Sequence, residues 1–235
     1  MYNHAMPISG YEIRICDSCG LRYPLTEGHP YGTRCPACMG ETRVVLTRKL
    51  VAEPGHGLPD NFHCTDAKTT NGSNEAGERL LAVLLDNIRS AWNAGSILRS
   101  AEGFGFAHAF FCGITPTPGN EAVTRASLGA EDSVPWSYHK DAVKLVKGLK
   151  QEGWKVYALE EDERAVTLGN DEDEDRKAVL IVGNEVTGVD PELLDLCKKI
   201  FFIPMRGEKK SFNAAVAFGI AAHALQNPRR GNVSQ

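Results

Sequence analysis

The stretch AVLIVGNEVTGVDPELL, residues 178–194, decides the fold of this chain. It opens on an apolar run of strand length that ends at Gly183. Gly188 then lets the chain turn, and Pro191 stands where a helix accepts proline, at its first position. The stretch therefore predicts a strand, a polar loop and a helix in succession.

The same alternation extends over the chain from residue 79 onward. Short apolar runs are separated by segments with a helical period, a pattern typical of an α/β fold with a mostly parallel sheet covered by helices on both faces. The expected strands are residues 80–85, 107–112, 155–159, 178–182 and 200–203, and the expected helices are residues 94–104, 120–128, 141–152, 191–198 and 211–226. Ligands of such sheets bind at the carboxyl ends of the strands, so the loops that follow strands are the candidate sites.

The amino-terminal segment carries a different signal. Cys16, Cys19, Cys35 and Cys38 form two C-x2-C pairs fifteen residues apart, the spacing of a structural four-cysteine zinc site. We expect a zinc ribbon over residues 1–53, a linker over residues 54–78 and a larger domain over residues 79–235. The ribbon's arginines and tyrosines suit contact with nucleic acid, although a structural or protein-docking role stays open.

Composition bounds the remaining classes. The 235 residues are 42% hydrophobic and 24% charged, and no apolar run reaches the length of a membrane span. No secretion signal is visible, so we expect a cytoplasmic protein. The net charge of -4 is misleading about partners, because residues 160–175 hold nine acidic residues and one basic. That acidic run is interpreted as a solvated surface loop, with a regulatory or partner-binding role as the alternative.

Two further loops contain candidate functional side chains. In the segment after residue 85, Asn93 is a suitable helix N-cap, and Arg99 falls on a polar stripe of the expected helix. After residue 203, a basic cluster of Arg206, Lys209 and Lys210 precedes Ser211, where an Ala-rich helix is expected to begin. That helix is apolar nearly all round, which favours burial against the domain or a second subunit.

Taken together, three segments resemble the motifs of the SpoU/TrmH class of RNA ribose methyltransferases in the SPOUT superfamily. They are N-x-G-x-I-x-R-x-A from Asn93, G-N-E-x-x-G from Gly183, and I-P-M-x-G followed by S-x-N from Ile203 to Asn213. The resemblance covers about 155 residues and does not include the ribbon.

The resemblance implies a trefoil knot near the carboxyl end, a homodimer that packs the first and last helices together, and S-adenosylmethionine as the methyl donor. It implies catalysis of 2'-O-methylation of tRNA or rRNA by Arg99, acting either as a base or by stabilising phosphate and alkoxide. The other implied catalytic residues are Asn93, Glu185, Ser211 and Asn213. The implied cofactor-binding residues are Gly183, Asn184, Gly188, Ile203, Met205 and Ser211.

Two other functions remain open. The chain could be an RNA-binding protein whose knotted domain senses a ligand without turnover, or an RNA base methyltransferase of the same superfamily. The alkali resistance of a 2'-O-methylated linkage separates both from ribose methylation.

Overall fold

The computed structural model describes residues 10–26, 29, 32–49, 79–169, 175, 177–208 and 211–226. The chain divides into two compact units, Met1–Cys64 and Thr65–Gln235. The expected linker, residues 54–78, lies outside the described residues, and so do Lys209 and Lys210 of the expected basic cluster. The expected domain boundaries therefore stay predictions.

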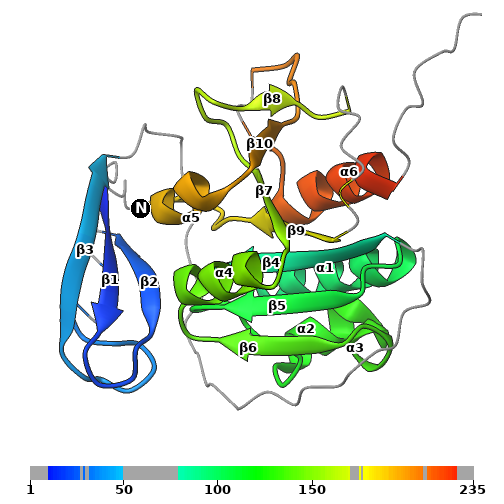
Figure 1. Cartoon of the computed structure of the whole chain (residues 1–235). Coiled ribbons are helices and arrows are strands. Elements are labelled where there is room, and N and C mark those ends of the chain that lie inside the picture. Colours follow the sequence, from blue (N-terminus) through cyan, green and yellow to red (C-terminus); the bar gives the residue numbers. More distant parts are fainter. Residues whose placement is uncertain are drawn as a thin grey trace, which may run out of the picture. The chain divides into compact units, whose positions relative to one another are not determined.

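The first unit is a three-stranded antiparallel sheet (Figure 1). Its central strand β1 (Gly10–Cys16) pairs with β2 (Arg22–Thr26) on one side and with β3 (Thr42–Lys49) on the other. Its buried apolar side chains include Ile13, Leu21 and Tyr23. So small a core needs additional stabilisation, and the end of β1 delivers Cys16 to the cluster that could supply it.

The second unit contains a seven-stranded sheet in the order β6-β5-β4-β9-β7-β10-β8, and all six pairings are parallel. The strands are β4 (Leu80–Asp86), β5 (His108–Cys112), β6 (Trp136–His139), β7 (Lys155–Leu159), β8 (Val166–Thr167), β9 (Lys177–Val182) and β10 (Lys199–Phe202). The parallel sheet expected from the sequence is confirmed.

Helices pack on both faces of this sheet, as Figure 1 shows. On β4, Leu81 and Val83 belong to the core shared with α1 (Ala91–Gly103), α2 (Glu121–Ser127), α3 (Ala130–Ser133) and α6 (Ala214–Gln226). The alternate residues Ala82 and Leu84 belong to the core shared with α4 (Ala142–Gln151) and α5 (Pro191–Leu196). Because successive side chains of a strand point to opposite faces of the sheet, β4 contributes residues to both cores.

Close packing of α1 on α2 depends on Gly95. A Cβ added there would lie 2.3 Å from the carbonyl oxygen of Val123, so a larger residue would push α2 away. This contact gives a structural reason for the glycine of the first motif.

The predicted and observed helix starts differ at two places. The N-cap of α1 is Ser90, whose side chain accepts a hydrogen bond from the backbone of Asn93, so the prediction that Asn93 caps this helix is wrong. The last helix begins at Ala214 rather than at Ser211, because Asn213 accepts the hydrogen bonds of its first turn. No helix in the described part of the chain has the length and apolar character needed to cross a bilayer.

Candidate functional site

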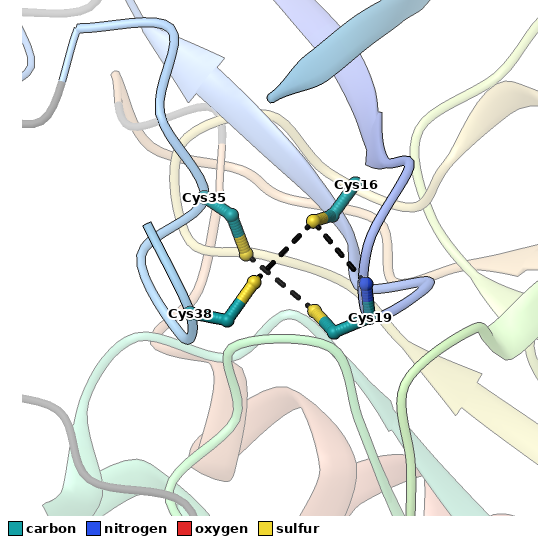
Figure 2. Close-up of side chains that lie close together, drawn as sticks. All are labelled: Cys16, Cys19, Cys35 and Cys38. Carbon is teal, nitrogen blue, oxygen red and sulfur yellow. Dashed lines mark hydrogen bonds between the residues drawn. The ribbon is translucent and has the colours of Figure 1, made fainter. Parts of the chain in front are cut away.

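The four predicted metal ligands converge at one end of the small sheet (Figure 2). Their four Sγ atoms all lie within 4.8 Å of one another. Cys16 Sγ is 3.5 Å from Cys38 Sγ, and Cys19 Sγ is 3.7 Å from Cys35 Sγ. In a tetrahedron with Zn–S bonds of about 2.3 Å, two sulfurs are ~3.8 Å apart, so the cluster has the size of a four-cysteine zinc site.

Two turns of similar geometry present the thiols. In the first, Gly20 donates to the Cys16 carbonyl and adopts a φ of 73°, and in the second Met39 donates to the Cys35 carbonyl with a φ of 60°. Gly40 has another role: a Cβ there would lie 2.6 Å from the Ser18 hydroxyl oxygen. The left-handed residue of the second turn is therefore Met39.

The thiols differ in acidity even without a metal. Burial opposes ionisation of Cys16, yet hydrogen bonds from the backbone of Cys19 and Ser18 lower its pKa to about 7. Burial raises the pKa of Cys19 to about 12. Cys16 is thus the thiol most readily available as a thiolate ligand in this pair.

The loop after β9 is a tight turn closed by its own backbone. Asn184 and Gly188 exchange two backbone hydrogen bonds, of 3.1 and 2.9 Å, and Gly188 has a φ of 70°. A Cβ at Gly183 would lie 2.3 Å from the backbone nitrogen of Val189, so only glycine fits there.

Asn184 holds this turn from within. Its buried side chain accepts hydrogen bonds from the backbones of Val186 and Thr187 and donates one of 2.7 Å to the carbonyl of Asn87. The side chain therefore fixes the loop against the exit of β4. A contact of Asn184 with a cofactor stays a prediction.

Three predicted residues from three separate segments meet in one hydrogen-bonded chain. Asn213, just before α6, donates through its amide to Asn93 Oδ1 at 2.9 Å, and Asn93 donates to Glu185 Oε1 at 2.8 Å. Glu185 also accepts from the backbones of Arg89 and Ser90, at 2.8 and 3.1 Å. A carboxylate from the β9 loop thus stabilises the positive amino-terminal end of α1.

The direction of this chain is fixed at both ends. The Glu185 carboxylate can accept only, so the amide nitrogen of Asn93 must face it. At the other end, Asn213 Oδ1 accepts from the backbones of Ala215 and Val216, which turns its own amide nitrogen toward Asn93. Each asparagine is therefore needed as donor and acceptor together.

A second polar cluster, which is buried, was not predicted from the sequence. Asp86 accepts from the backbone of Asp190 at 2.9 Å and from the side chain of Asn87 at 2.8 Å. Asn87 in turn accepts from the backbone of Ile114, and the Thr115 hydroxyl accepts from the backbone of Ile88. The cluster joins the exits of β4, β5 and β9, and its sequence signal was the polar pair directly after an apolar strand.

Glu160 corrects the interpretation of the acidic run. Its carboxylate accepts hydrogen bonds from the backbones of Val189 and Glu161, at 2.8 and 3.1 Å. It lies against the α-carbon of Gly188, since a Cβ there would be 2.4 Å from Glu160 Oε2. Burial raises the pKa of Glu160, with the backbone hydrogen bonds opposing the shift. Glu160, the first residue of the acidic run, therefore supports the β9 loop, and the interpretation of the run as a solvated loop is wrong for this residue. Residues 170–174 of the run lie outside the described residues.

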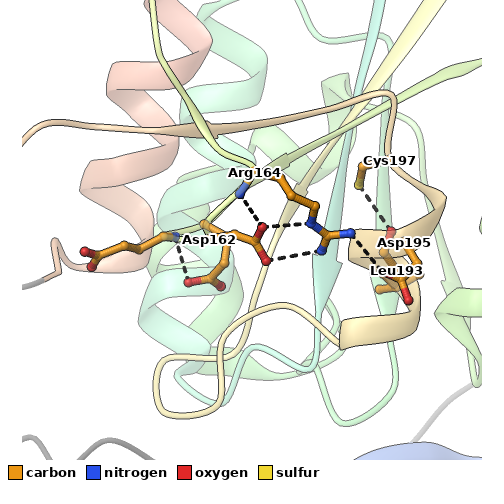
Figure 3. A network of polar contacts seen from close by, with 7 residues as sticks. Asp162, Arg164, Leu193, Asp195 and Cys197 are labelled. Carbon is orange, nitrogen blue, oxygen red and sulfur yellow. Dashed lines mark hydrogen bonds and ion pairs between the residues drawn. The ribbon is translucent and has the colours of Figure 1, made fainter.

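The next residues of the run form the exposed network of Figure 3. Arg164 binds Asp162 at 2.8 Å and Asp195 on α5 at 2.8 Å. Nearby, Cys197 donates through its thiol to the carbonyl of Leu193, and burial raises its pKa to about 12. This network ties the segment after β7 to α5 and contains none of the predicted site residues.

The remaining predicted site residues are not joined to the chain of Asn213, Asn93 and Glu185 by any hydrogen bond within the described residues. Arg99 and Ser211 are exposed, and Ile203 and Met205 are half-buried after β10. Arg89 is a neighbour that the prediction missed: burial lowers the pKa of its guanidinium, and the charge of Glu185 opposes that shift.

Comparison with known proteins agrees with this geometry. The model of the SpoU rRNA Methylase family matches residues 80–223. An uncharacterized tRNA/rRNA methyltransferase of Mycobacterium bovis is 31% identical over 154 residues, which are 64% of this chain and 46% of that protein. The tRNA (guanosine(18)-2'-O)-methyltransferase of Aquifex aeolicus is 28% identical over 160 residues, covering 66% of this chain and 72% of that one.

A solved structure gives the same result for the fold. The AdoMet-bound rRNA methyltransferase from Sinorhizobium meliloti superposes with a TM-score of 0.60 at 27% identity, covering 67% of this chain and 58% of that one. The chain spans about half the length of the mycobacterial relatives it matches. Because the family model matches more than half of its residues, the chain belongs to the SpoU rRNA methylase family.

Proposed function

We propose that this protein transfers a methyl group from S-adenosylmethionine to a ribose 2'-hydroxyl of tRNA or rRNA. The observation that carries the proposal is the hydrogen-bonded chain of Asn213, Asn93 and Glu185, which joins all three motif segments. The relative from Aquifex aeolicus is a tRNA 2'-O-methyltransferase by name, and the Sinorhizobium meliloti structure contains AdoMet.

The residues near the β9 loop fit S-adenosylmethionine. The strands β9, β7 and β10 are consecutive in the sheet, and ligands of parallel sheets bind at such carboxyl ends. Half-buried Ile203 and Met205 offer an apolar wall, and Glu160 places a carboxylate beside the loop for a ligand that carries a sulfonium and an ammonium group. The ligand supplies a methyl group that is already electrophilic.

The chain's own residues then have to orient the acceptor hydroxyl. Arg99 holds the adjacent phosphate and lowers the energy of the developing alkoxide, because a guanidinium keeps its proton at neutral pH and is a poor base. Ser211 hydrogen-bonds near the acceptor hydroxyl. The hydrogen bond from Asn213 to Asn93 keeps the segment before α6, which contains Ser211, in place for this contact. The proton leaves to the phosphate or to water.

Two features of the family belong to the same proposal. Support for a trefoil knot comes from β9, which follows β7 in the chain yet lies between β4 and β7, and from Asn213, which returns to α1. Support for a homodimer comes from α6, which packs on α1 yet leaves Val216 and Ile220 exposed, one turn apart, at 52% and 38%.

Structural zinc in the four-cysteine cluster is also proposed. The sulfur separations fit the ion, and four protein ligands leave no open position for catalysis. Reduced cysteines of this kind suit the expected cytoplasmic location.

A labelling experiment tests the proposed reaction. The full chain is incubated with methyl-labelled S-adenosylmethionine and with tRNA and rRNA from cells that lack the protein. We expect label in dinucleotides that resist alkaline cleavage. Label in alkali-sensitive mononucleotides would favour a base methyltransferase, and binding of RNA without any label would favour the non-catalytic alternative.

A further inference from the structure

Two exposed aromatic side chains flank the hydrogen bond between Asn93 and Asn213. Trp92 precedes Asn93 on α1 and is 59% exposed, and Phe212 precedes Asn213 and is 40% exposed. The two asparagine side chains are 2.9 Å apart. Two separate segments therefore each bring an aromatic residue to the same part of the candidate site.

Trp92 is unusual among the tryptophans of the described residues. Trp154 is buried, and Trp136 packs against the core formed with α1. An indole ring left in water forgoes the large apolar burial that normally fixes such a residue, so a surface tryptophan beside a site points to a ligand.

The register of α1 places a positive charge on the same face. Residues 94, 97, 98 and 101 are buried, whereas Trp92 and Arg99 are exposed. Seven residues span two turns of helix, about 10.5 Å along its axis. Arg99 is exposed and makes no ion pair within the described residues, so its charge stays available to a polyanion.

An aromatic ring and a cation along one exposed face are the elements with which proteins bind single-stranded nucleic acid. The ring stacks on a base, and the cation binds the backbone. Every base has a stacking face, so such a contact adds affinity without dictating sequence. Unpaired segments are also where proteins reach RNA bases most readily.

We propose that Trp92 is a stacking platform for an unpaired base of the RNA substrate, next to the ribose that is methylated, and that Phe212 provides a second aromatic contact. The inference rests on the proposed function for its choice of RNA. Trp92 acts on RNA affinity and positioning, and it leaves the methyl donor's site unchanged.

Direct binding tests this inference independently of methyl transfer. The probes are an unstructured RNA of about 12 nucleotides and an abasic strand with the same number of phosphates, each titrated against the full chain in the presence of S-adenosylhomocysteine. We expect Trp92→Ala to weaken binding of the RNA by about 5- to 150-fold, the range that corresponds to one stacked base, and to leave binding of the abasic strand unchanged.

Two further variants test whether the effect requires an aromatic ring at position 92. Trp92→Phe keeps a stacking face and should restore most of the affinity, while losing the quenching of tryptophan fluorescence that the RNA causes in the native protein. Val166→Ala is the matched control, because Val166 is an exposed apolar residue on β8, which three strands separate from β4 in the sheet order. It should bind both probes like the native protein.

The outcomes separate this inference from the proposed function. Equal affinity of the native protein and Trp92→Ala for the RNA would overturn the stacking role even if the native protein methylates RNA. A weakened Trp92→Ala in a protein that transfers no methyl group would uphold stacking and overturn the proposed reaction. Trp92→Ala could instead dissociate a dimer in sedimentation while the RNA affinity per subunit stays unchanged. That result would overturn the stacking role and show that Trp92 contacts a second copy of the chain.

Discussion

The substitution Asn93→Asp tests the directed hydrogen-bond chain with almost no change in side-chain size. Asn93 Nδ2 lies 2.8 Å from Glu185 Oε1, so the substitution places a second carboxylate oxygen where a donor stood. The native hydrogen bond is lost, at about 1 kcal/mol, and two like charges face each other. At about 4 Å their repulsion is ~1 kcal/mol in a water-like medium and ~4 kcal/mol near a protein surface.

Since Glu185 is exposed, we take the lower part of this range. Asn93→Asp should then lower the free energy of unfolding by about 2–3 kcal/mol near neutral pH. Repulsion raises the folded pKa of the carboxylate pair above the unfolded values of about 4, so the folded state takes up a proton as the pH falls. A protonated carboxyl can donate to its neighbour, and most of the loss should disappear below a pH of about 5.

Urea denaturation of the variant and the native protein, each at about pH 7.5 and 5, measures this difference as a shift in midpoint. Asn93→Ala is the control, because it removes both side-chain hydrogen bonds of Asn93 without adding charge and should cost about 1–2 kcal/mol at both pH values. An equal loss for Asn93→Asp at both pH values, or no loss at either, would refute the directed chain.

Three further predictions concern the zinc cluster, the β9 loop and Arg99. Removing zinc with a chelator, or replacing Cys16 by Ser, should unfold the sheet of β1, β2 and β3 while the larger unit keeps its thermal transition. Unchanged protection of the amides of these strands from hydrogen exchange in the metal-free protein would contradict a structural zinc. Gly183→Ala should destabilise the fold by about 1–3 kcal/mol in thermal melts, because the added Cβ would lie 2.3 Å from backbone. Gly148→Ala in α4 is the control and should be neutral or stabilising by about 0.5–1 kcal/mol, because a Cβ there meets nothing within 4 Å. Similar effects of the two substitutions would be evidence against a tight loop. Arg99→Ala should bind S-adenosylmethionine normally in calorimetry yet lower the methylation rate by roughly 100-fold or more. Arg125→Ala, which removes another exposed helical arginine, is the control and should methylate normally. Near-normal methylation by Arg99→Ala would exclude Arg99 from the mechanism.

Much of the fold follows from local patterns. The strand at residues 155–159 has the predicted bounds, and the strand of residues 178–182 extends by one residue to Lys177, because buried parallel strands stand out as apolar runs. The strand β6 was missed, since Trp136–His139 is a short edge segment with no apolar run. The start of α1 was misplaced because two residues suited to capping, Ser90 and Asn93, lie three positions apart and only tertiary contacts decide between them.

Three of the predicted site residues lie together in the structure, but their connections could not be predicted from the sequence. Asn93, Glu185 and Asn213 each stood in a recognisable motif, yet their hydrogen bonds join positions 92 and 120 residues apart in the chain. The polar pair of Asp86 and Asn87 was only a weak signal, because polar residues after an apolar strand resemble an ordinary loop. The hydrogen bond from the backbone of Asp190 to Asp86 is a tertiary contact that the sequence does not reveal. Glu160 was assigned to a solvated run because charge composition cannot tell which carboxylate the fold encloses.

One measurement tests the central claim most directly: the mapping of 2'-O-methyl groups at nucleotide resolution in tRNA and rRNA from cells with and without this protein. We predict at least one ribose whose 2'-O-methylation disappears with the protein, returns with the native chain and does not return with Arg99→Ala. Identical ribose methylation in both cells, or a lost mark that resides on a base, would contradict the account.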